Sequence, residues 1–131
     1  MPVKGNPVPW IRKAEQDYEA AIALARRRKR PVADVVCFHA QQCAEKYLKA
    51  FLAQHRLYFP KTHDLAELLN LAVPWEPSLE LLRPFVTPLT PYAVSFRYPD
   101  EQAAAAEARR ALTCVRRARE HLRQVLRLRM P

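Results

Sequence analysis

Basic side chains at helical spacing are the strongest candidates for chemistry in this sequence. Lys46 and Lys49 are three residues apart, so a helix places them side by side, with Gln42 one turn before Lys46. Arg97 stands before a Tyr-Pro pair, which favours an extended segment from which the guanidinium can reach across the fold. Such cations bind phosphate oxygens through charge and hydrogen bonds. The pattern predicts a site for a phosphate-bearing ligand, either a nucleotide or an RNA backbone.

Further polar residues belong to the same prediction. His63 and Asp64 are expected at the rim of this site. Asp17 lies at the edge of an otherwise apolar helix face, where a carboxylate needs a partner, and Glu45 stands directly before Lys46 and four residues before Lys49. These two carboxylates are the expected counter-charges when the site is empty. The alternative is that they pair with the basic residues only to hold the fold together.

Catalytic candidates are weak. Arg116 and His121 have the spacing Arg-x4-His, in which a histidine could move the proton of a ribose 2′-hydroxyl. They lie in an arginine-rich segment, where such a spacing is expected by chance. The four histidines lack the spacing of zinc ligands, and the three cysteines (Cys37, Cys43 and Cys114) form no CxxC pair. We therefore expect no metal, no cofactor and three free thiols.

Charge and composition narrow the function classes. The net charge is +9, and the excess is at the two ends: residues 1–30 hold eight basic and three acidic residues, and residues 100–131 hold eight and four. A basic surface favours polyanions. With one glycine in 131 residues, glycine-rich phosphate loops are excluded. The chain has neither an apolar run long enough for a membrane span nor a signal peptide pattern, so a cytoplasmic protein is expected.

Proline placement predicts the elements that hold these residues. Proline is absent from 10–30, 32–59, 61–73 and 100–130, whereas six of the twelve prolines lie in 74–99. We expect four helices, at 9–30, 32–55, after Thr62 as N-cap to 72, and from Asp100 as N-cap to 128. Helical spacing of apolar residues within 78–93 predicts one more short or kinked helix.

Apolar periodicity predicts how the helices pack. The second helix is apolar nearly all round, so it is expected to be central or shared with a partner chain. In the last helix the spacing predicts a core face and an opposite arginine face. The core face comprises Ala104, Ala108, Ala111, Val115, Ala118, Leu122, Val125 and Leu126, and the arginine face Arg109, Arg116, Arg123 and Arg127. The sequence predicts an all-α, up-and-down bundle of four to five helices that forms one domain over 1–131.

Three motifs carry a resemblance to a known family. They are F-H-A-Q-Q-C-A-E-K-Y-L-K-A at 38–50, K-T-H-D-L at 61–65 and F-R-Y-P-D at 96–100, preceded by Ala14-x-x-Asp17. In order and content they resemble the HEPN family (higher eukaryotes and prokaryotes nucleotide-binding), from about Trp10 to Leu126. The resemblance implies a helical bundle, usually dimeric and often encoded beside a minimal nucleotidyltransferase.

Some members of this family are ribonuclease toxins, with an Arg-x4–6-His motif near the start of a late helix. Arg97 occupies the arginine position, but residues 98–103 contain no histidine. We therefore expect a homodimeric module that binds a nucleotide or RNA and pairs with a nucleotidyltransferase, as in toxin–antitoxin pairs. Two alternatives stay open. One is a metal-independent ribonuclease that uses Arg97 or Arg116 with His121 or His63, and the other is a dimeric scaffold without a ligand.

Overall fold

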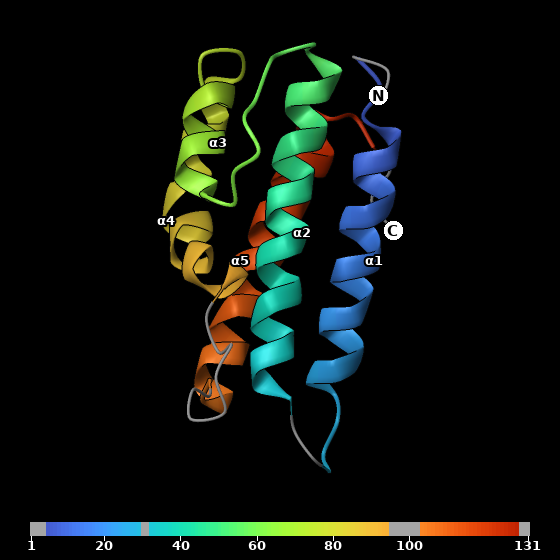
Figure 1. Ribbon diagram of the computed structural model, residues 1–131, viewed down its shortest axis with the longest axis vertical. Coiled ribbons are helices and arrows are strands. Elements are labelled where there is room, and N and C mark those ends of the chain that lie inside the picture. Colours follow the sequence, from blue (N-terminus) through green and yellow to red (C-terminus); the bar gives the residue numbers. More distant parts are fainter. Residues whose placement is uncertain (1–4, 30–31, 95–102, 129–131) are drawn as a thin grey trace.

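A computed structural model describes residues 5–29, 32–94 and 103–128, and these residues form helices without any strand. The elements follow in the order α1 (Val8–Ala25), α2 (Ala33–Gln54), α3 (Leu65–Ala72), η1 (Pro77–Leu82), α4 (Arg83–Val86), η2 (Thr87–Ala93) and α5 (Ala105–Val125), where η marks a 3₁₀-helix (Figure 1). The all-α prediction is confirmed.

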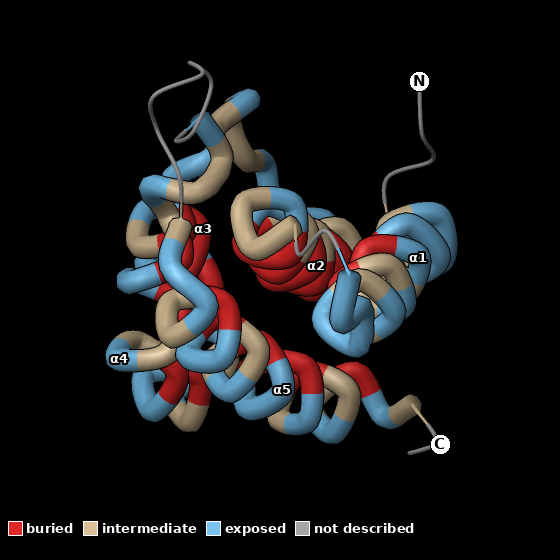
Figure 2. The backbone as a smooth tube through the Cα atoms, turned by 90° about the horizontal axis from the view of Figure 1, so that it is seen from below, coloured by how far each residue is buried: buried red, intermediate tan, exposed pale blue. Residues whose placement is uncertain are grey.

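Helix α2 is the centre of the bundle. It packs against α1 on one side, α5 on a second and the α3–η2 region on a third, and its buried residues cover most of its circumference (Figure 2). The largest side chains without solvent contact include Tyr47, Leu48, Phe51 and Leu52, all from this helix. The predicted central position is therefore confirmed, and it means that polar groups on α2 can be reached from two neighbouring elements at once.

Helix α1 is shorter than predicted. It ends at Ala25, before a run of basic residues at 26–29 that are all exposed. Consecutive cations repel one another, and no packing contact offsets that repulsion. The helix therefore stops where its last core-facing residues end.

The N-cap of α3 is Asp64 and not Thr62, so that prediction was wrong. The carboxylate of Asp64 accepts the backbone N–H groups of Ala66 and Glu67, at 3.0 and 3.4 Å. Thr62 Oγ1 instead accepts the backbone N–H of Asp64 at 3.1 Å. A carboxylate is the stronger partner for the positive end of a helix, which explains why Asp64 and not Thr62 is the N-cap.

The proline-rich segment forms three short turns of helix in place of one longer helix. Each of η1, α4 and η2 has a proline in its first turn, where no hydrogen bond from its nitrogen is needed. Leu79, Leu82, Val86 and Leu89 point into the core from these turns. The expected kinked helix is thus present as a 3₁₀–α–3₁₀ series.

Helix α5 starts at Ala105, and the predicted cap Asp100 lies outside the described residues. The predicted core face is confirmed at most positions, but Ala104 is exposed because it precedes the first turn.

Cys37 and Cys43 are buried free thiols whose pKa values are raised by desolvation, as expected for apolar fillers. None of the described helices has the length and hydropathy that a bilayer span needs.

Candidate nucleic-acid interface

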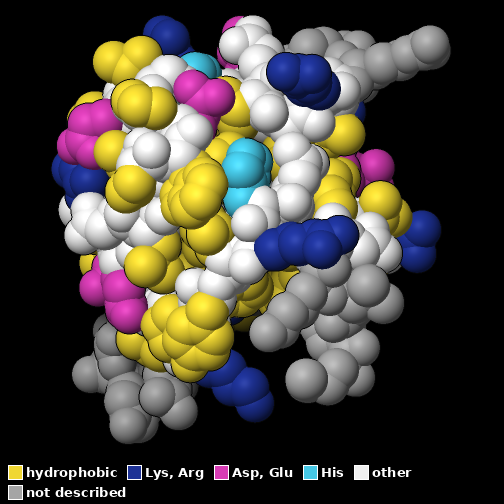
Figure 3. Space-filling model, turned by 90° about the horizontal axis from the view of Figure 1, so that it is seen from above, with side chains coloured by type: hydrophobic (Ala, Val, Ile, Leu, Met, Phe, Trp, Pro, Cys, Tyr) yellow, Lys and Arg dark blue, Asp and Glu magenta, His cyan; other side chains and the backbone are white. Residues whose placement is uncertain are grey.

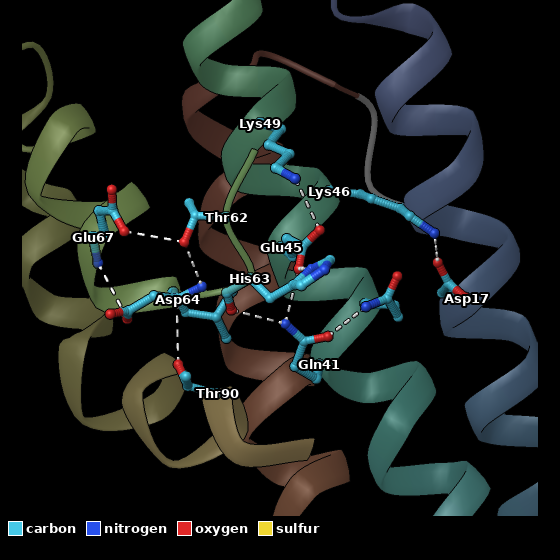
Figure 4. A network of polar contacts seen from close by, with 12 residues as sticks. Asp17, Gln41, Glu45, Lys46, Lys49, Thr62, His63, Asp64, Glu67 and Thr90 are labelled. Atoms are coloured by element: carbon cyan, nitrogen blue, oxygen red, sulfur yellow. Dashed lines mark hydrogen bonds and ion pairs between the residues drawn. The ribbon is translucent and has the colours of Figure 1, made fainter. Parts of the chain in front are cut away.

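Two polar clusters lie on neighbouring faces of α2 (Figure 4). The first faces α1, and we call it the α1-side cluster: Asp17, His39 and Lys46. The second faces the loop before α3, and we call it the α3-side cluster: Gln41, Glu45, Lys49 and His63. Gln42 extends the α3-side cluster, because its amide donates to Gln41 Oε1 at 2.7 Å.

In the α1-side cluster one carboxylate holds two nitrogen donors. Asp17 is 8% exposed and accepts from His39 Nδ1 at 2.8 Å and from Lys46 Nζ at 2.6 Å. An ionised carboxylate can only accept, so Nδ1 of His39 carries the proton. The expectation that Asp17 needs a partner is confirmed, and the partners come from α2.

In the α3-side cluster Glu45 is almost fully buried and accepts three hydrogen bonds. The donors are Gln41 Nε2 at 3.0 Å, Lys49 Nζ at 3.0 Å and His63 Nδ1 at 2.8 Å. Burial by itself would raise the pKa of Glu45, but the three hydrogen bonds and the Lys49 charge lower it below its usual value. Glu45 is therefore a stably ionised group inside the protein.

Lys49 and Gln41 act inside the fold. Lys49 is 7% exposed, and its ammonium lies 5.6 Å from the ring centroid of Trp10 in addition to its pair with Glu45. Gln41 has no solvent contact, and its Nε2 also donates to the backbone carbonyl of His63 at 3.2 Å. This cluster consequently fastens the loop before α3 to the middle of α2.

The six predicted ligand residues thus fall into different environments. Lys46 and Gln42 are half-buried, and the His63 side chain is 63% exposed, so these three are accessible from solvent. Lys49 is enclosed, and Asp64 caps α3. Arg97 lies outside the described residues. Within the described part of the chain, each lysine of α2 already has one carboxylate as its partner.

A second buried network links α1, α2 and α5, and the sequence reasoning did not find it. Arg119 donates from Nε and Nη2 to Glu15 at 2.7 Å each, and Tyr47 Oη also donates to Glu15. Arg123 Nη1 donates to Tyr47 Oη at 2.9 Å. The sequence held one signal for Arg119. It lies four residues after Val115, so it falls on the face of the last helix that was predicted to face the core.

Arg123 was predicted on the solvent face, and this was wrong. Its side chain is 12% exposed and points toward Tyr47 and Glu15. Its position lies at the border of the core face, one residue past Leu122, and the long side chain bends inward because a carboxylate is available there.

The structure does not bring Arg116 and His121 together. Five residues of helix correspond to a rotation of about 140° between two positions. Arg116 is exposed, whereas His121 faces Ser78 of η1. Ser78 donates its only O–H to Glu76 at 3.0 Å, so the 2.9 Å hydrogen bond between Ser78 Oγ and His121 Nε2 is donated by the histidine.

The outer face of α5 carries an excess of positive charge. We call it the α5 basic face, and its residues are Arg109, Arg110, Arg116 and Arg117, all of them exposed. None forms an ion pair with a described residue, and Arg117 lies 5.7 Å from the ring centroid of Phe85. This face differs from α2, where carboxylates balance the cations.

Metal chemistry has no candidate among the described residues, since no group of three His, Cys, Asp or Glu side chains is arranged to hold an ion.

The family comparison gives a clear result: the HEPN domain model matches residues 8–125. The chain therefore belongs to the HEPN family, as the motifs on α2 indicated. Comparison with curated proteins and with solved structures gives no match.

Proposed function

We propose that this HEPN domain is an RNA-binding module, with a nucleotide as the smallest unit it recognises. The observation that carries the proposal is the α5 basic face, where four exposed arginines have no carboxylate partner among the described residues. Arginine pairs with phosphate through two parallel hydrogen bonds, and clustered exposed arginines attract polyanions. The basic run at 26–29 after α1 adds to the same excess of charge.

The geometry of α5 suits a nucleic-acid backbone. Arg109 and Arg116 are seven residues apart, so they lie about 10 Å apart along the helix axis and on the same face. Phosphates of a strand repeat at a spacing of only a few ångströms, so one strand can meet both guanidinium groups. These contacts read the backbone and not the bases, so the face is expected to bind RNA with little sequence preference.

Lys46 supplies a second, weaker contact in this proposal. Its ammonium has three N–H donors and is 22% exposed, so it can bind a phosphate while it remains next to Asp17. Gln42 and His63 are the accessible hydrogen-bonding side chains nearby. Because Asp17 and Glu45 neutralise the lysines, this α2 site is expected to bind a single phosphate weakly.

The domain is proposed to act as a homodimer and to pair with a nucleotidyltransferase. The support for the dimer is the first half of α2, where Val35 and Phe38 stay 39% and 40% exposed on a helix whose other residues are buried or half-buried. The support for the second partner is the family itself. Co-purification of the chain with a nucleotidyltransferase encoded beside it tests that pairing.

The experiment for RNA binding compares two matched variants by calorimetric titration with a short single-stranded RNA. Arg109→Gln with Arg116→Gln is expected to weaken binding and to reduce the slope of log affinity against log salt by about 1.4, since two phosphate contacts are lost. Lys46→Gln is expected to change the slope by about half as much or less. Unchanged affinity of the double variant, with an unchanged melting temperature, would refute the assignment to α5.

A further inference from the structure

A groove with a volume of about 210 Å³ lies between α5 and the short turns η1 and α4. The residues that line it and carry the argument are Leu81, Leu82, Phe85, Arg117, Glu120 and His121. Figure 3 shows the end of the molecule to which the last turns of α5 lead, and hydrophobic and charged side chains lie next to one another on its surface. The volume is below the roughly 300–1,000 Å³ typical of small-molecule sites, so the groove suits one or two side chains of a larger partner.

The wall formed by η1 and α4 is apolar and open to solvent. Leu81 is 69% exposed, whereas its neighbour Leu82 is 3% exposed and belongs to the core. Phe85 lines the same groove and is half-buried. A single exposed leucine is common on protein surfaces, but here it stands in a groove beside an aromatic ring. A partner that covered this wall would remove its apolar area from water.

Two contacts across the groove hold its walls in place. His121 of α5 is hydrogen-bonded to Ser78 of η1 at 2.9 Å. The guanidinium carbon of Arg117 lies 5.7 Å from the ring centroid of Phe85 in α4. Because both contacts are made within the chain itself, the groove is already formed before a partner arrives, which reduces the entropy cost of binding.

The α5 rim of the groove carries an excess of positive charge. Arg110 and Arg117 are seven residues apart and lie along one line of the helix, with Arg116 next to them. All three are exposed and form no ion pair with a described residue. Glu120 is the one carboxylate among the lining residues, one turn after Arg116 and Arg117, and it offsets only one of these three charges.

The walls themselves restrict the shape of the partner. They are helical turns, whose backbone groups are bonded within each element, so they present no edge to which an extended peptide could add as a strand. A partner segment must satisfy its own backbone hydrogen bonds, as a helix does. On the facing wall Glu80 is paired with Arg83 at 2.6 Å, which leaves that wall close to neutral. The charge of the rim thus decides the charge of the partner.

We propose that this groove binds an amphipathic, acidic helix of a different protein. Its apolar side chains pack against Leu81 and Phe85, and carboxylates on its flank pair with Arg117. A second copy of this chain is a poor occupant, because its net charge of +9 is repelled by the basic rim. The contact does not depend on RNA binding, and the apolar wall lies outside the α5 basic face.

The test uses two designed peptides of about 18 residues, long enough to form a helix. Each has two leucines four residues apart on one face and alanine elsewhere, except that the positions flanking the leucines are glutamates in the glutamate peptide and lysines in the lysine peptide. Calorimetric titration of the full chain at low salt should give a dissociation constant of roughly 10–100 μM for the glutamate peptide. The lysine peptide should bind at least tenfold more weakly.

Four variants locate the contact. Leu81→Ser should weaken binding of the glutamate peptide about tenfold, because it removes an apolar contact without changing the charge. Arg117→Glu should weaken it at least tenfold and strengthen binding of the lysine peptide, whereas Glu120→Gln should tighten binding of the glutamate peptide about twofold. Arg12→Glu, at an exposed position of α1, makes the same change in net charge as Arg117→Glu and should leave the affinity within about twofold.

The failures of this proposal and of RNA binding are distinguishable. Leu81→Ser should keep the RNA affinity and the molecular mass of the wild-type chain, and circular dichroism should show that each variant is folded. A loss of RNA affinity in Leu81→Ser would assign the groove to RNA, and a change in its mass by light scattering would assign it to contacts between copies. Either result would overturn the proposal, as would no heat at millimolar glutamate peptide, equal affinity for the two peptides, or full affinity in Leu81→Ser or Arg117→Glu.

Discussion

Arg119 of α5 and Glu15 of α1 form a two-point ion pair, with Nε and Nη2 of the arginine each 2.7 Å from a carboxylate oxygen. The guanidinium also lies 4.3 Å from the ring centroid of Tyr18. This contact joins two residues that are 104 positions apart in the chain. Because the Arg119 side chain is only 10% exposed, its charge depends on Glu15 for compensation.

Removal of Glu15 is therefore expected to destabilise the bundle. Glu15→Ala should lower the free energy of unfolding by about 2–3 kcal/mol, because it leaves a mostly buried guanidinium without its partner. Urea denaturation measures this. The double variant Glu15→Ala with Arg119→Met should recover part of the loss, and Glu80→Ala, in an exposed pair with Arg83, should have a much smaller effect. A double variant no more stable than Glu15→Ala would contradict the explanation.

Stability should fall in acid because of Glu45. Its pKa in the folded protein is below the usual value near 4.5, so it binds a proton more readily in the unfolded chain. Its contribution is present in full above about pH 5 and disappears as the pH falls below 4.5 and through the folded pKa. Glu45→Gln should lose about 2–4 kcal/mol at pH 7, since Lys49 stays buried.

The measurement is chemical denaturation of Glu45→Gln and the wild-type chain between pH 7 and pH 3. The difference between the two should shrink toward pH 3. Glu19→Gln, at an exposed position of α1, is the control and should show a small difference that does not vary with pH in this way. A constant difference for Glu45→Gln would mean that its carboxylate has no special role.

Arg56 is expected to be a site where glycine stabilises the protein. It follows the end of α2 with φ at 57°, and the bonds Arg56 N–H to Ala53 O and Leu57 N–H to Leu52 O close the turn. Side chains other than glycine are strained there, so Arg56→Gly should raise the free energy of unfolding by roughly 0.5–1 kcal/mol. A thermal melt measures it, and a lower melting temperature would contradict it.

The dimer is expected to depend on Phe38. Light scattering of the wild-type chain at micromolar concentration should give the mass of a dimer, and Phe38→Asp should give that of a monomer, because it introduces a charge into an apolar contact. Leu81→Asp is the control, since Leu81 is 69% exposed on η1, away from α2. A monomeric wild-type chain would rule out this interface.

We expect RNA binding without cleavage and without a metal requirement. Chelator should leave the affinity for RNA unchanged, and the RNA should be recovered intact on a gel after incubation. The reason is that Arg116 and His121 point to different surroundings, and His121 is bonded to Ser78. Cleavage that His121→Ala abolishes would restore the ribonuclease alternative.

Local patterns in the sequence determined where the helices lie and which helix is the most buried. Proline exclusion placed α1, α2, α3 and α5 to within a few residues in most cases, because a proline ring interrupts a helix wherever it occurs in its interior. Periodicity identified α2 as the central helix, because a helix that is apolar all round can only be buried. The same reasoning identified Asp17 as a residue in need of a partner.

Only the tertiary structure decided which charges meet. Lys46 and Lys49 looked equivalent in sequence, yet one is half-exposed beside Asp17 and the other is enclosed with Glu45. Arg123 was predicted on the solvent-facing arginine face and Arg119 was not singled out, yet both turn inward to the network around Glu15. The physical reason is the length of these side chains. A few degrees of helix rotation, set by packing with distant segments, determine which carboxylate each charged group can reach.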